Sequence, residues 1–435
     1  MRLFQSYARR VKHIAHRLEV KKYLEPAAYL PLTRLTQVAL PNLSTTYLSL
    51  PRCPAPLMSL YISQRLQHIE ADLGFKFSKL SNEIAFCDFM EQVLVGCLEL
   101  KGVSLRGLSS PRLNGIISLM GKLQTLSLRL GQSLLPSTLR SIMTFPNLSE
   151  LEVHAGHIDV DDLERNHLEV QFPSLRKLCI RAKSNVVKNI LHRIQRDNLR
   201  YLHIELDDSS PSTASWNIIL SLVCDQAASS LLYLQIEHHF ETPEIPILSP
   251  VDMGQTPNTP QGSIASTMSF DDIHILRVIK QLRHFTCDVT LPPLFQDKDM
   301  ADLATWWPDL EHLELGSAPQ GDEAESTGNA QITIASLTSF ATQSPKLEKL
   351  ILPLRIGDHP LPPSASHPPA TNKLRSLTIA QLRSCKPLEL AKYLRRLFPL
   401  LEGFEGPCDD TQIWMDTKAA LSNIEFLNFW LLILT

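Results

Sequence analysis

The sequence lacks several features that catalytic and nucleic-acid-binding proteins usually display. Its 435 residues carry a formal net charge of only −3, whereas nucleic-acid binding usually needs a strongly basic face. No Gly-x-Ser-x-Gly or Gly-x-Gly-x-x-Gly motif occurs. The segment 115–122 (GIISLMGK) has one residue too many between its glycines for a phosphate-binding loop, and Leu123 stands where Ser or Thr would hold magnesium. We therefore expect no enzyme, no cofactor and no nucleic-acid partner.

Metal motifs and long apolar runs are also missing. The eight cysteines are scattered without a Cys-x-x-Cys pair, which favours reduced packing residues over zinc ligands or disulfides. His154 and His157 lie near three aspartates, but they lack the helical His-Glu-x-x-His pattern of zinc proteases and are interpreted as solvated loop residues. No signal peptide is visible, and no apolar run reaches the roughly 18 residues of a membrane span. We expect no metal, no membrane association, and a location in the cytoplasm or nucleus.

What the sequence has in quantity is the motif Leu-x-x-Leu-x-Leu, with Ile or Val allowed at its last position. Successive copies mostly start about 23 to 37 residues apart, close to the period of leucine-rich repeats. The clear copies are Leu123-Leu126-Leu128, Leu148-Leu151-Val153, Leu175-Leu178-Ile180, Leu199-Leu202-Ile204, Leu231-Leu234-Ile236, Leu310-Leu313-Leu315, Leu347-Leu350-Leu352 and Leu374-Leu377-Ile379.

The motif predicts a short strand in each repeat. Its last two apolar residues are two apart, so both side chains fall on one face of the strand. One strand cannot bury that face alone, and stacking copies in parallel makes a continuous core. Between strands, 135–145, 186–194 and 299–307 show helical spacing, and Asp299 is a candidate N-cap. We predict an α/β fold: a right-handed leucine-rich-repeat solenoid, or horseshoe, with parallel strands on the concave face and helices on the convex face.

Weaker copies extend the array in both directions. They are Leu35-Val38-Leu40, Leu66-Ile69-Ala71, Leu100-Val103-Leu105, Leu282-Phe285-Cys287 and the degraded Leu401-x-x-Phe404. Leu57-Leu60-Ile62 also matches, but it begins only nine residues before Leu66. We keep Leu66, because it divides the interval from Leu35 to Leu100 evenly. The solenoid is therefore expected over residues 32–406.

The two ends of the chain are expected to differ from the repeats. In residues 1–31 a helical apolar stripe formed by Leu3, Phe4, Tyr7, Val11, Ile14 and Leu18 predicts an amphipathic helical cap. A mitochondrial presequence has the same character and stays as the alternative. Residues 407–435 are expected to form a C-terminal cap or tail. Their last stretch is very apolar and too short to span a bilayer.

Three insertions interrupt the period, at 241–270, 318–330 and 357–372. They are rich in Pro, Ser, Thr or small acidic residues, and we expect exposed mobile loops. In the first, Ser249-Pro250, Thr256-Pro257 and Thr259-Pro260 leave two interpretations open: phosphorylation sites or an unmodified spacer.

If the motif residues point into the core, the residues between and after them point to the concave face. The position just after the last motif residue gives a basic run followed by an acidic run: Arg106, Arg129, His154, Arg181, then Glu205, Glu237 and Asp288. The position just before the second motif residue gives Tyr201, Tyr233, His284 and His312, and His203 lies between the two positions. Rings of this kind suit an interface. The hypothesis is a bipolar surface that binds a protein of opposite charge order, so charge reversal at Arg129 and Arg181 should weaken binding. The alternative is a solvated face with charges in chance order.

The phrases FPNLSELEV, FPSLRKLCI, WPDLEHLEL and SPKLEKLIL resemble the repeat region of fungal F-box proteins of the large mushroom-type families. The opening FQSYARRVKHI is similar to the segment that follows the F-box in those proteins. The resemblance runs from about Phe4 to Glu405. It implies a non-catalytic substrate-recognition role in a cullin-type ubiquitin ligase, with the repeats binding the protein to be ubiquitinated.

In that family an N-terminal F-box docks on a Skp-type adaptor. This sequence has no Leu-Pro-x-Glu-Ile/Val-Leu stretch, and the faint echo at 81–86 (SNEIAF) lacks its Leu-Pro. We therefore expect the Skp-type adaptor as a partner only if an F-box belongs upstream. A stand-alone scaffold or regulator, for instance of a small GTPase, is the alternative, and an enzyme hidden in the repeats is the remote one.

Overall fold

The computed structural model divides the chain into two compact units, Met1–Leu199 and Arg200–Thr435. We call them the first unit and the second unit. The structure describes residues 2–16, 39–51, 53, 55–75, 80–164, 171–208, 216–239, 268–290, 293, 295–316, 332–357, 361, 372–382, 385–406 and 411–434. The three expected insertions fall largely outside these residues, and so do their Ser-Pro and Thr-Pro sites.

Each unit is a stack of parallel strands, and within a unit the strands pair in chain order. The first unit contains β1 (His13–Ala15), β2 (Thr45–Ser49), β3 (His68–Gly74), β4 (Gly102–Gly107), β5 (Thr125–Arg129), β6 (Glu150–His154) and β7 (Lys177–Ala182). The second contains β8 (Tyr201–Leu206), β9 (Tyr233–His238), β10 (His284–Val289), β11 (His312–Glu314), β12 (Lys349–Ile356), β13 (Ser376–Leu382) and β14 (Gly403–Glu405).

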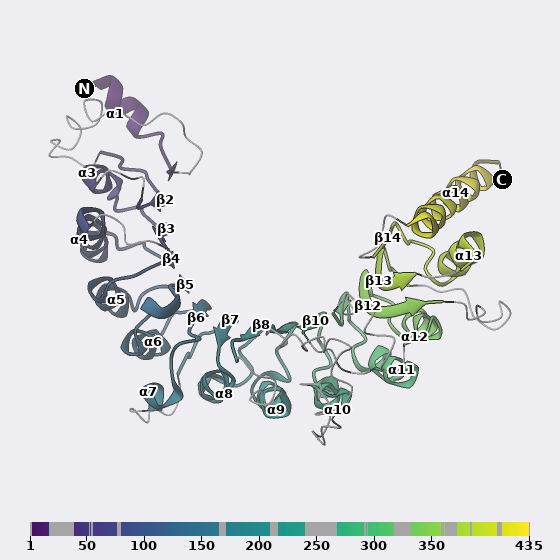
Figure 1. The fold of residues 1–435 in the computed structure, drawn as a ribbon. Coiled ribbons are helices and arrows are strands. Elements are labelled where there is room, and N and C mark those ends of the chain that lie inside the picture. The colour runs from purple at the N-terminus through teal and green to yellow at the C-terminus, as the bar shows by residue number, and fades with distance from the viewer. Residues whose placement is uncertain are drawn as a thin grey trace, which may run out of the picture. The chain divides into compact units, whose positions relative to one another are not determined.

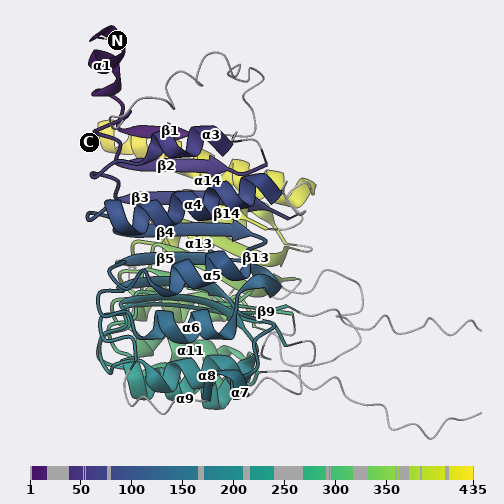
Figure 2. The ribbon, with the colours of Figure 1, turned by 90° about the vertical axis from the view of Figure 1, so that its left-hand side faces the viewer.

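Helices cover one side of the strands in each unit (Figure 1). In the first unit they are α1 (Arg2–Ala8), α3 (Ala55–Met58), α4 (Leu80–Gly96), α5 (Pro111–Ser118), α6 (Pro136–Met143), α7 (Val160–Glu164) and α8 (Ser184–Arg193). In the second they are α9 (Trp216–Ala227), α10 (Phe270–His274), α11 (Asp297–Trp306), α12 (Ala335–Gln343), α13 (Pro387–Leu397) and α14 (Gln412–Leu434). Short 3₁₀ turns occur at η1 (Ser59–Tyr61), η2 (Gly131–Ser133) and η4 (Ile275–Val278). Figure 2 shows β2 to β5 stacked behind α3 to α6. This layering of strands and helices is the leucine-rich-repeat architecture that the motif predicted.

The motif residues form the core, as the spacing predicts. Leu126, Leu151 and Leu178 lie side by side in register on successive strands, and each is almost completely buried. The second unit repeats this row with Leu202, Leu234, Phe285, Leu313, Leu350, Leu377 and Phe404. Each strand therefore buries its apolar face only by lying beside the next one, which makes the repeats interdependent.

The predicted helices occur close to their expected bounds. Pro136 begins α6, where its missing N–H costs no hydrogen bond. The role of Asp299 is different from the expected one. It is the third residue of a capping box, in which its carboxylate accepts a hydrogen bond from the backbone N–H of Gln296, the actual N-cap. The N-cap, and with it the start of the helix, therefore lies three residues earlier than the pattern predicts.

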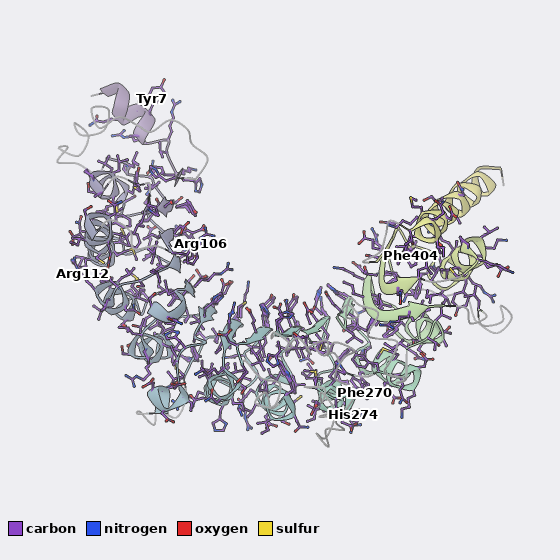
Figure 3. All side chains as sticks on the ribbon, in the orientation of Figure 1. Tyr7, Arg106, Arg112, Phe270, His274 and Phe404 are labelled. Atoms are coloured by element: carbon purple, nitrogen blue, oxygen red, sulfur yellow. The ribbon has the colours of Figure 1, made fainter. Side chains whose placement is uncertain are left out.

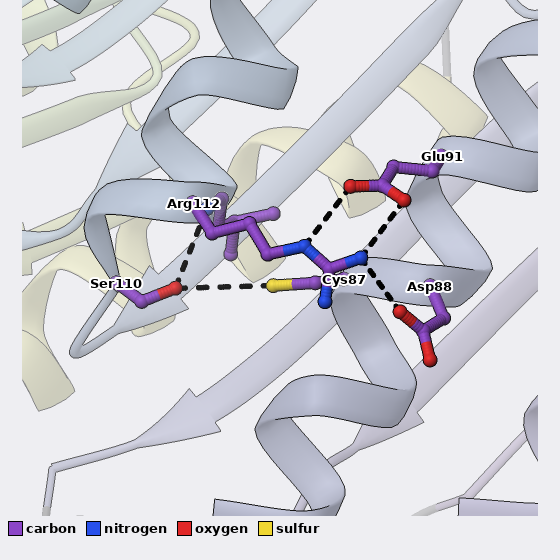
Figure 4. Close-up of polar contacts among 6 residues, drawn as sticks. Cys87, Asp88, Glu91, Ser110 and Arg112 are labelled. Atoms are coloured by element: carbon purple, nitrogen blue, oxygen red, sulfur yellow. Dashed lines mark hydrogen bonds and ion pairs between the residues drawn. The ribbon is translucent and has the colours of Figure 1, made fainter.

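Contacts between neighbouring helices tie the repeats together on the helix side. Arg112 at the start of α5 donates from Nε to the Glu91 carboxylate at 3.0 Å, and from Nη2 to Glu91 at 2.8 Å and Asp88 at 2.7 Å on α4 (Figure 4). Ser110 caps α5 by accepting a hydrogen bond from the backbone N–H of Leu113. Its hydroxyl also lies 3.8 Å from the Cys87 thiol.

The beginning of the chain differs from the expected helical cap. Helix α1 ends at Ala8, and His13–Ala15 form strand β1 instead of continuing the helix. The carbonyl of Lys12 accepts hydrogen bonds from the backbone N–H groups of Ser44 and Thr45, and β1 pairs with β2. An edge strand offers unpaired backbone groups, and pairing with it stabilises an extended segment where the apolar spacing alone fitted a helix. Residues 17–38 lie outside the described part of the chain.

The predicted copy Leu35-Val38-Leu40 lies outside the described residues except for Leu40, which is in a bend, so this prediction stays untested. Strand β2 belongs to Leu43-x-x-Thr46-x-Leu48, whose three motif residues are completely buried. The choice of Leu66 over Leu57 is confirmed, because Ile69 and Ala71 lie in β3, whereas Leu57 lies in helix α3.

At the other end, the degraded copy Leu401-x-x-Phe404 forms strand β14. Helix α14 follows, and its Trp414 ring lies 4.7 Å from the Phe404 ring between centroids. Trp414 is completely buried, so the start of α14 covers the core beside the last strand. Among the helices within the described part of the chain, none is both long and apolar enough to cross a membrane.

Candidate functional site

Each strand presents alternate side chains on the side away from the helices. We call this side of each unit its strand face. In β8 the half-buried residues are Tyr201, His203 and Glu205, and the residues between them are buried. The same alternation in the other strands gives three outward positions for each full-length strand. Figure 3 shows Arg106 on the strand side of the first unit and Arg112 on its helix side.

The second unit carries a row of four rings at the first outward position. Tyr201, Tyr233, His284 and His312 are register partners on successive strands, and we call them the ring ladder. The two tyrosine rings stack with centroids 4.1 Å apart and an interplanar angle of 10°. The Tyr233 ring stacks on His284 at 5.3 Å, and the His284 and His312 rings meet edge to face at 5.8 Å. The ladder is therefore a prearranged aromatic surface with little side-chain freedom left to lose on binding.

Four residues further along these strands lies a row of carboxylates. Glu205, Glu237 and Asp288 are register partners, and we call them the carboxylate row. The Glu237 carboxylate contacts His203 Nε2 at 3.1 Å and accepts a hydrogen bond from the Gln235 amide. Gln235 accepts in turn from the Tyr233 hydroxyl at 2.9 Å. This chain of contacts links the ring ladder to the carboxylate row.

Histidines lie near most of the acids of this face. His239 Nε2 is 3.7 Å from Asp288 and 4.0 Å from Glu237. His284 Nε2 lies 3.4 Å from Glu311. His312 Nε2 lies 3.5 Å from Glu314 but outside hydrogen-bond geometry, so this contact is electrostatic only.

The electrostatics of the second strand face follow from partial burial. Burial lowers the pKa of His284, the neighbouring His312 lowers it further, and Glu311 opposes the shift. Burial raises the pKa of Asp288. His239 opposes that rise, while the negative charges of Glu237 and Glu314 add to it. Carboxylates are therefore crowded on this face.

The strand face of the first unit is organised differently. Arg106 donates to the Asp72 carboxylate at 3.0 Å, and Arg129 donates from Nε to Glu152 at 2.6 Å. Glu152 also accepts from the Ser127 hydroxyl at 2.7 Å. Burial would raise the pKa of Glu152, but the hydrogen bonds from Ser127 and Arg129 outweigh burial and lower it. Acids and bases of this face thus largely compensate one another.

The sequence predicted the register of the site residues but not their neighbours. Arg106 pairs in register with Arg129, and His154 with Arg181. Asp72 and Glu152 lie among them, so the expected basic run is charge-compensated. Asp72 follows the last motif residue of β3 just as Arg106 follows that of β4, so extending the row by one strand would have found it. The binding role of the predicted residues stays a prediction.

The first unit also has a small apolar hollow. Its volume is about 90 Å³, and it lies beside the ends of α4 and α5, where Leu98 and Leu119 are largely exposed. Its lining includes Cys97 and Lys122 among apolar side chains. Burial raises the pKa of the Cys97 thiol, which donates to the carbonyl of Ser63, so the thiol is a poor nucleophile. Within the described residues, no group of three or more His, Cys, Asp or Glu is arranged to hold a metal ion.

Comparison with known proteins does not identify a family for this chain. No family model matches the sequence, and no curated protein matches it. A chain in the crystal structure of the Rad7 and Elc1 complex in yeast is similar in structure, with 13% sequence identity and a TM-score of 0.46. The similarity covers 82% of this chain and 74% of that chain. The function therefore has to be inferred from the residues of the chain itself.

Proposed function

We propose that this chain is a non-catalytic recognition protein that binds a protein partner through the strand face of its second unit. The ring ladder carries this proposal. It places four half-buried rings side by side on a backbone fixed by parallel pairing. Aromatic side chains of this kind contribute large contact areas at low entropic cost, and they are enriched in protein interfaces.

The finer proposal is that the partner is a substrate of a ubiquitin ligase and that the chain is the recognition part of an F-box-type receptor. Its support is the resemblance of the repeat phrases to fungal F-box proteins. A Skp-type adaptor would then join the complex through an F-box upstream of the repeats. A stand-alone scaffold is the competing function, and it requires the same strand face but no adaptor.

The test is affinity capture with Tyr233→Ala, because Tyr233 is stacked on both sides. The full-length chain carrying a tag is incubated with extract of its native organism, and retained proteins are quantified by mass spectrometry. Truncating a central interface ring commonly costs about 2 kcal/mol, so retention of the specific partner should fall about thirtyfold. Tyr47→Ala is the matched control, since Tyr47 lies half-buried on the strand face of the first unit. Equal retention by both variants and the wild type would refute the proposal.

The ligase role has a separate readout. Co-purification of a Skp-type adaptor with the product of the complete gene would support it. A partner that is retained and Tyr233-dependent, without any adaptor, would assign the chain to the stand-alone scaffolds.

A further inference from the structure

The strand face of β8 to β11 has acids but no lysine or arginine at its outward positions. Along these four described strands the outward residues are Tyr201, His203, Glu205, Tyr233, Gln235, Glu237, His284, Thr286, Asp288, His312 and Glu314. Histidine is the only residue type here that can carry a positive charge. Near neutral pH such a surface attracts cations, since free histidine titrates around pH 6.5.

Asp288 lies among other acids of this face and is only partly compensated by histidine. Asp288 is 46% exposed, and its nearest cationic partner is the His239 ring at 3.7 Å. Burial raises the pKa of Asp288, His239 opposes that rise, and the negative charges of Glu237 and Glu314 add to it. An arriving guanidinium or ammonium group would relieve this repulsion, so the face has a stronger interaction with a cation than with a neutral or anionic group.

The ring ladder and the carboxylate row stand at a fixed separation. They lie four residues apart along each strand, which corresponds to roughly 13 Å at about 3.3 Å per residue. A partner that uses both must present an apolar or planar group and a cationic group at that spacing. Arginine suits the second role, because its planar fork can bind a carboxylate with two hydrogen bonds.

We infer that the partner of this face is a protein segment carrying arginine or lysine side chains that pair with Glu205, Glu237 and Asp288 while neighbouring apolar side chains lie on the ring ladder. This inference rests on the proposed function and specifies the chemistry of the partner. It assigns affinity to the ring ladder and charge selectivity to the carboxylate row.

The experiment uses the full-length chain and three sets of immobilised synthetic peptides. The sets are matched in length and apolar content and are rich in arginine, in serine or in glutamate. The wild type should favour the arginine-rich set, and the variant Glu205→Gln/Glu237→Gln/Asp288→Asn should bind that set roughly tenfold more weakly. The matched control Asp225→Asn/Asp302→Asn/Glu402→Gln removes three exposed acids of the same unit outside its strand face and should bind like the wild type.

A measurement on the wild type keeps the test valid if the triple variant does not fold. Binding of the arginine-rich set should weaken steadily as salt is raised, since salt screens ion pairs. Equal binding of all three sets, or affinity that does not depend on salt, would overturn the inference. If Tyr233→Ala abolishes partner capture while the carboxylate variant does not weaken it, the strand face binds an uncharged partner: the inference fails and the proposed function stands. If neither change affects capture, both fail.

Discussion

The two strand faces share one backbone plan and differ in how their charges are balanced. In the first unit, arginines lie against acids, as in the pairs Arg106–Asp72 and Arg129–Glu152. In the second unit, histidines lie against Glu237, Asp288 and Glu314, as in His203–Glu237. Arginine keeps its charge at every accessible pH, whereas histidine loses its charge near neutrality. The first face is therefore self-compensated, and the second has a net attraction for cations.

This difference indicates which face is better suited to binding. A partner of the first unit would have to break or desolvate existing ion pairs, which offsets much of the gain from new contacts. A partner of the second unit meets a stacked aromatic surface and the half-exposed Asp288 carboxylate, which is crowded by Glu237 and Glu314. The repeat motif constrains only the residues that point into the core. The residues of the strand face can therefore differ between the two units, so that one face is self-compensated and the other is suited to binding.

The largest expected effect is a loss of stability on substitution in the core of the second unit, at Leu234, whose neighbours on both adjacent strands are apolar. Leu234 is completely buried between Leu202 and Phe285. Leu234→Thr removes buried apolar volume and buries a hydroxyl, so it should lower the free energy of unfolding of this unit by about 3 kcal/mol. Hydrogen exchange of the β8 to β10 amides measures the change. Leu388→Thr, at an exposed position of α13, should change it by less than about 0.5 kcal/mol; similar effects at both sites would show that the core is more tolerant than we infer.

The first unit already contains a hydroxyl at the equivalent core position. Thr46 is completely buried, and its Oγ1 has no hydrogen-bond partner. Thr46→Val removes an unsatisfied polar atom while keeping the shape of the side chain, so it should stabilise the first unit by about 1 kcal/mol. Slower hydrogen exchange in β2 and β3 would show this. Thr125→Val, on the half-buried strand face, is the control with little expected effect; faster exchange in Thr46→Val would mean that the hydroxyl has a partner.

Thr46 also shows where sequence reasoning succeeds and fails. The repeats with leucine at the motif positions are predictable from the sequence, because the regularly spaced apolar residues are the ones that the fold buries. The copy at Leu43 was missed, because a polar residue occupies the second motif position and only the neighbouring strands reveal its burial. Similarly, Ile14 fits a helical stripe, and pairing with β2 decides that it lies in a strand.

The candidate site was predictable in part for a related reason. Period-two alternation places Tyr201 and Tyr233 on one face, and successive repeats place them side by side. The ion pairs of Arg106 and Arg129 depend on acids at outward positions that were not included in the predicted rows. The pKa shifts depend on partial burial, which a motif does not encode. Sequence thus predicted the positions of the rings and charges but not their balance.

The pH dependence of the second unit tests whether its histidines are the titrating partners. The pKa of His284 lies below its ordinary value of 6.5, and its surroundings include His312, Glu311, Arg283 and the Tyr233 ring. Between the folded pKa and 6.5 the unfolded chain binds more protons at this site, so stability should fall as the pH is lowered through that window. His284→Gln should flatten this dependence.

Glu311→Gln should steepen the pH dependence of stability that His284→Gln flattens, and it therefore serves as the control. Glu311 raises the pKa of His284, so removing its charge should lower that pKa further and make the loss of stability on acidification larger. Hydrogen exchange in β9 to β11 at several pH values from about 5 to 8 measures both slopes. Parallel slopes for the two variants would mean that His284 is not the group responsible.

The smallest expected effect is at Arg129 in the first unit, where the ion pair is partly exposed. The Arg129 side chain is 54% exposed and that of Glu152 is 27% exposed, so Arg129→Met should cost less than about 1 kcal/mol. The pKa of Glu152 lies below its ordinary value, so its contribution to stability is present above that value and is lost as the pH falls through the folded pKa. Arg129→Met should therefore shift acid unfolding of the first unit to higher pH, and adding Glu152→Gln should cancel that shift.

Charge reversal at this site turns the comparison into a binding test. Because Glu152 already occupies Arg129, we expect Arg129→Glu, alone or with Arg181→Glu, to reduce partner capture by less than about threefold, far less than Tyr233→Ala. Arg176→Glu, at an exposed loop position ahead of β7, controls for the change in net charge. If reversal at Arg129 weakens capture more than loss of the Tyr233 ring does, the first strand face is the binding surface, and charge compensation does not prevent recognition in this chain.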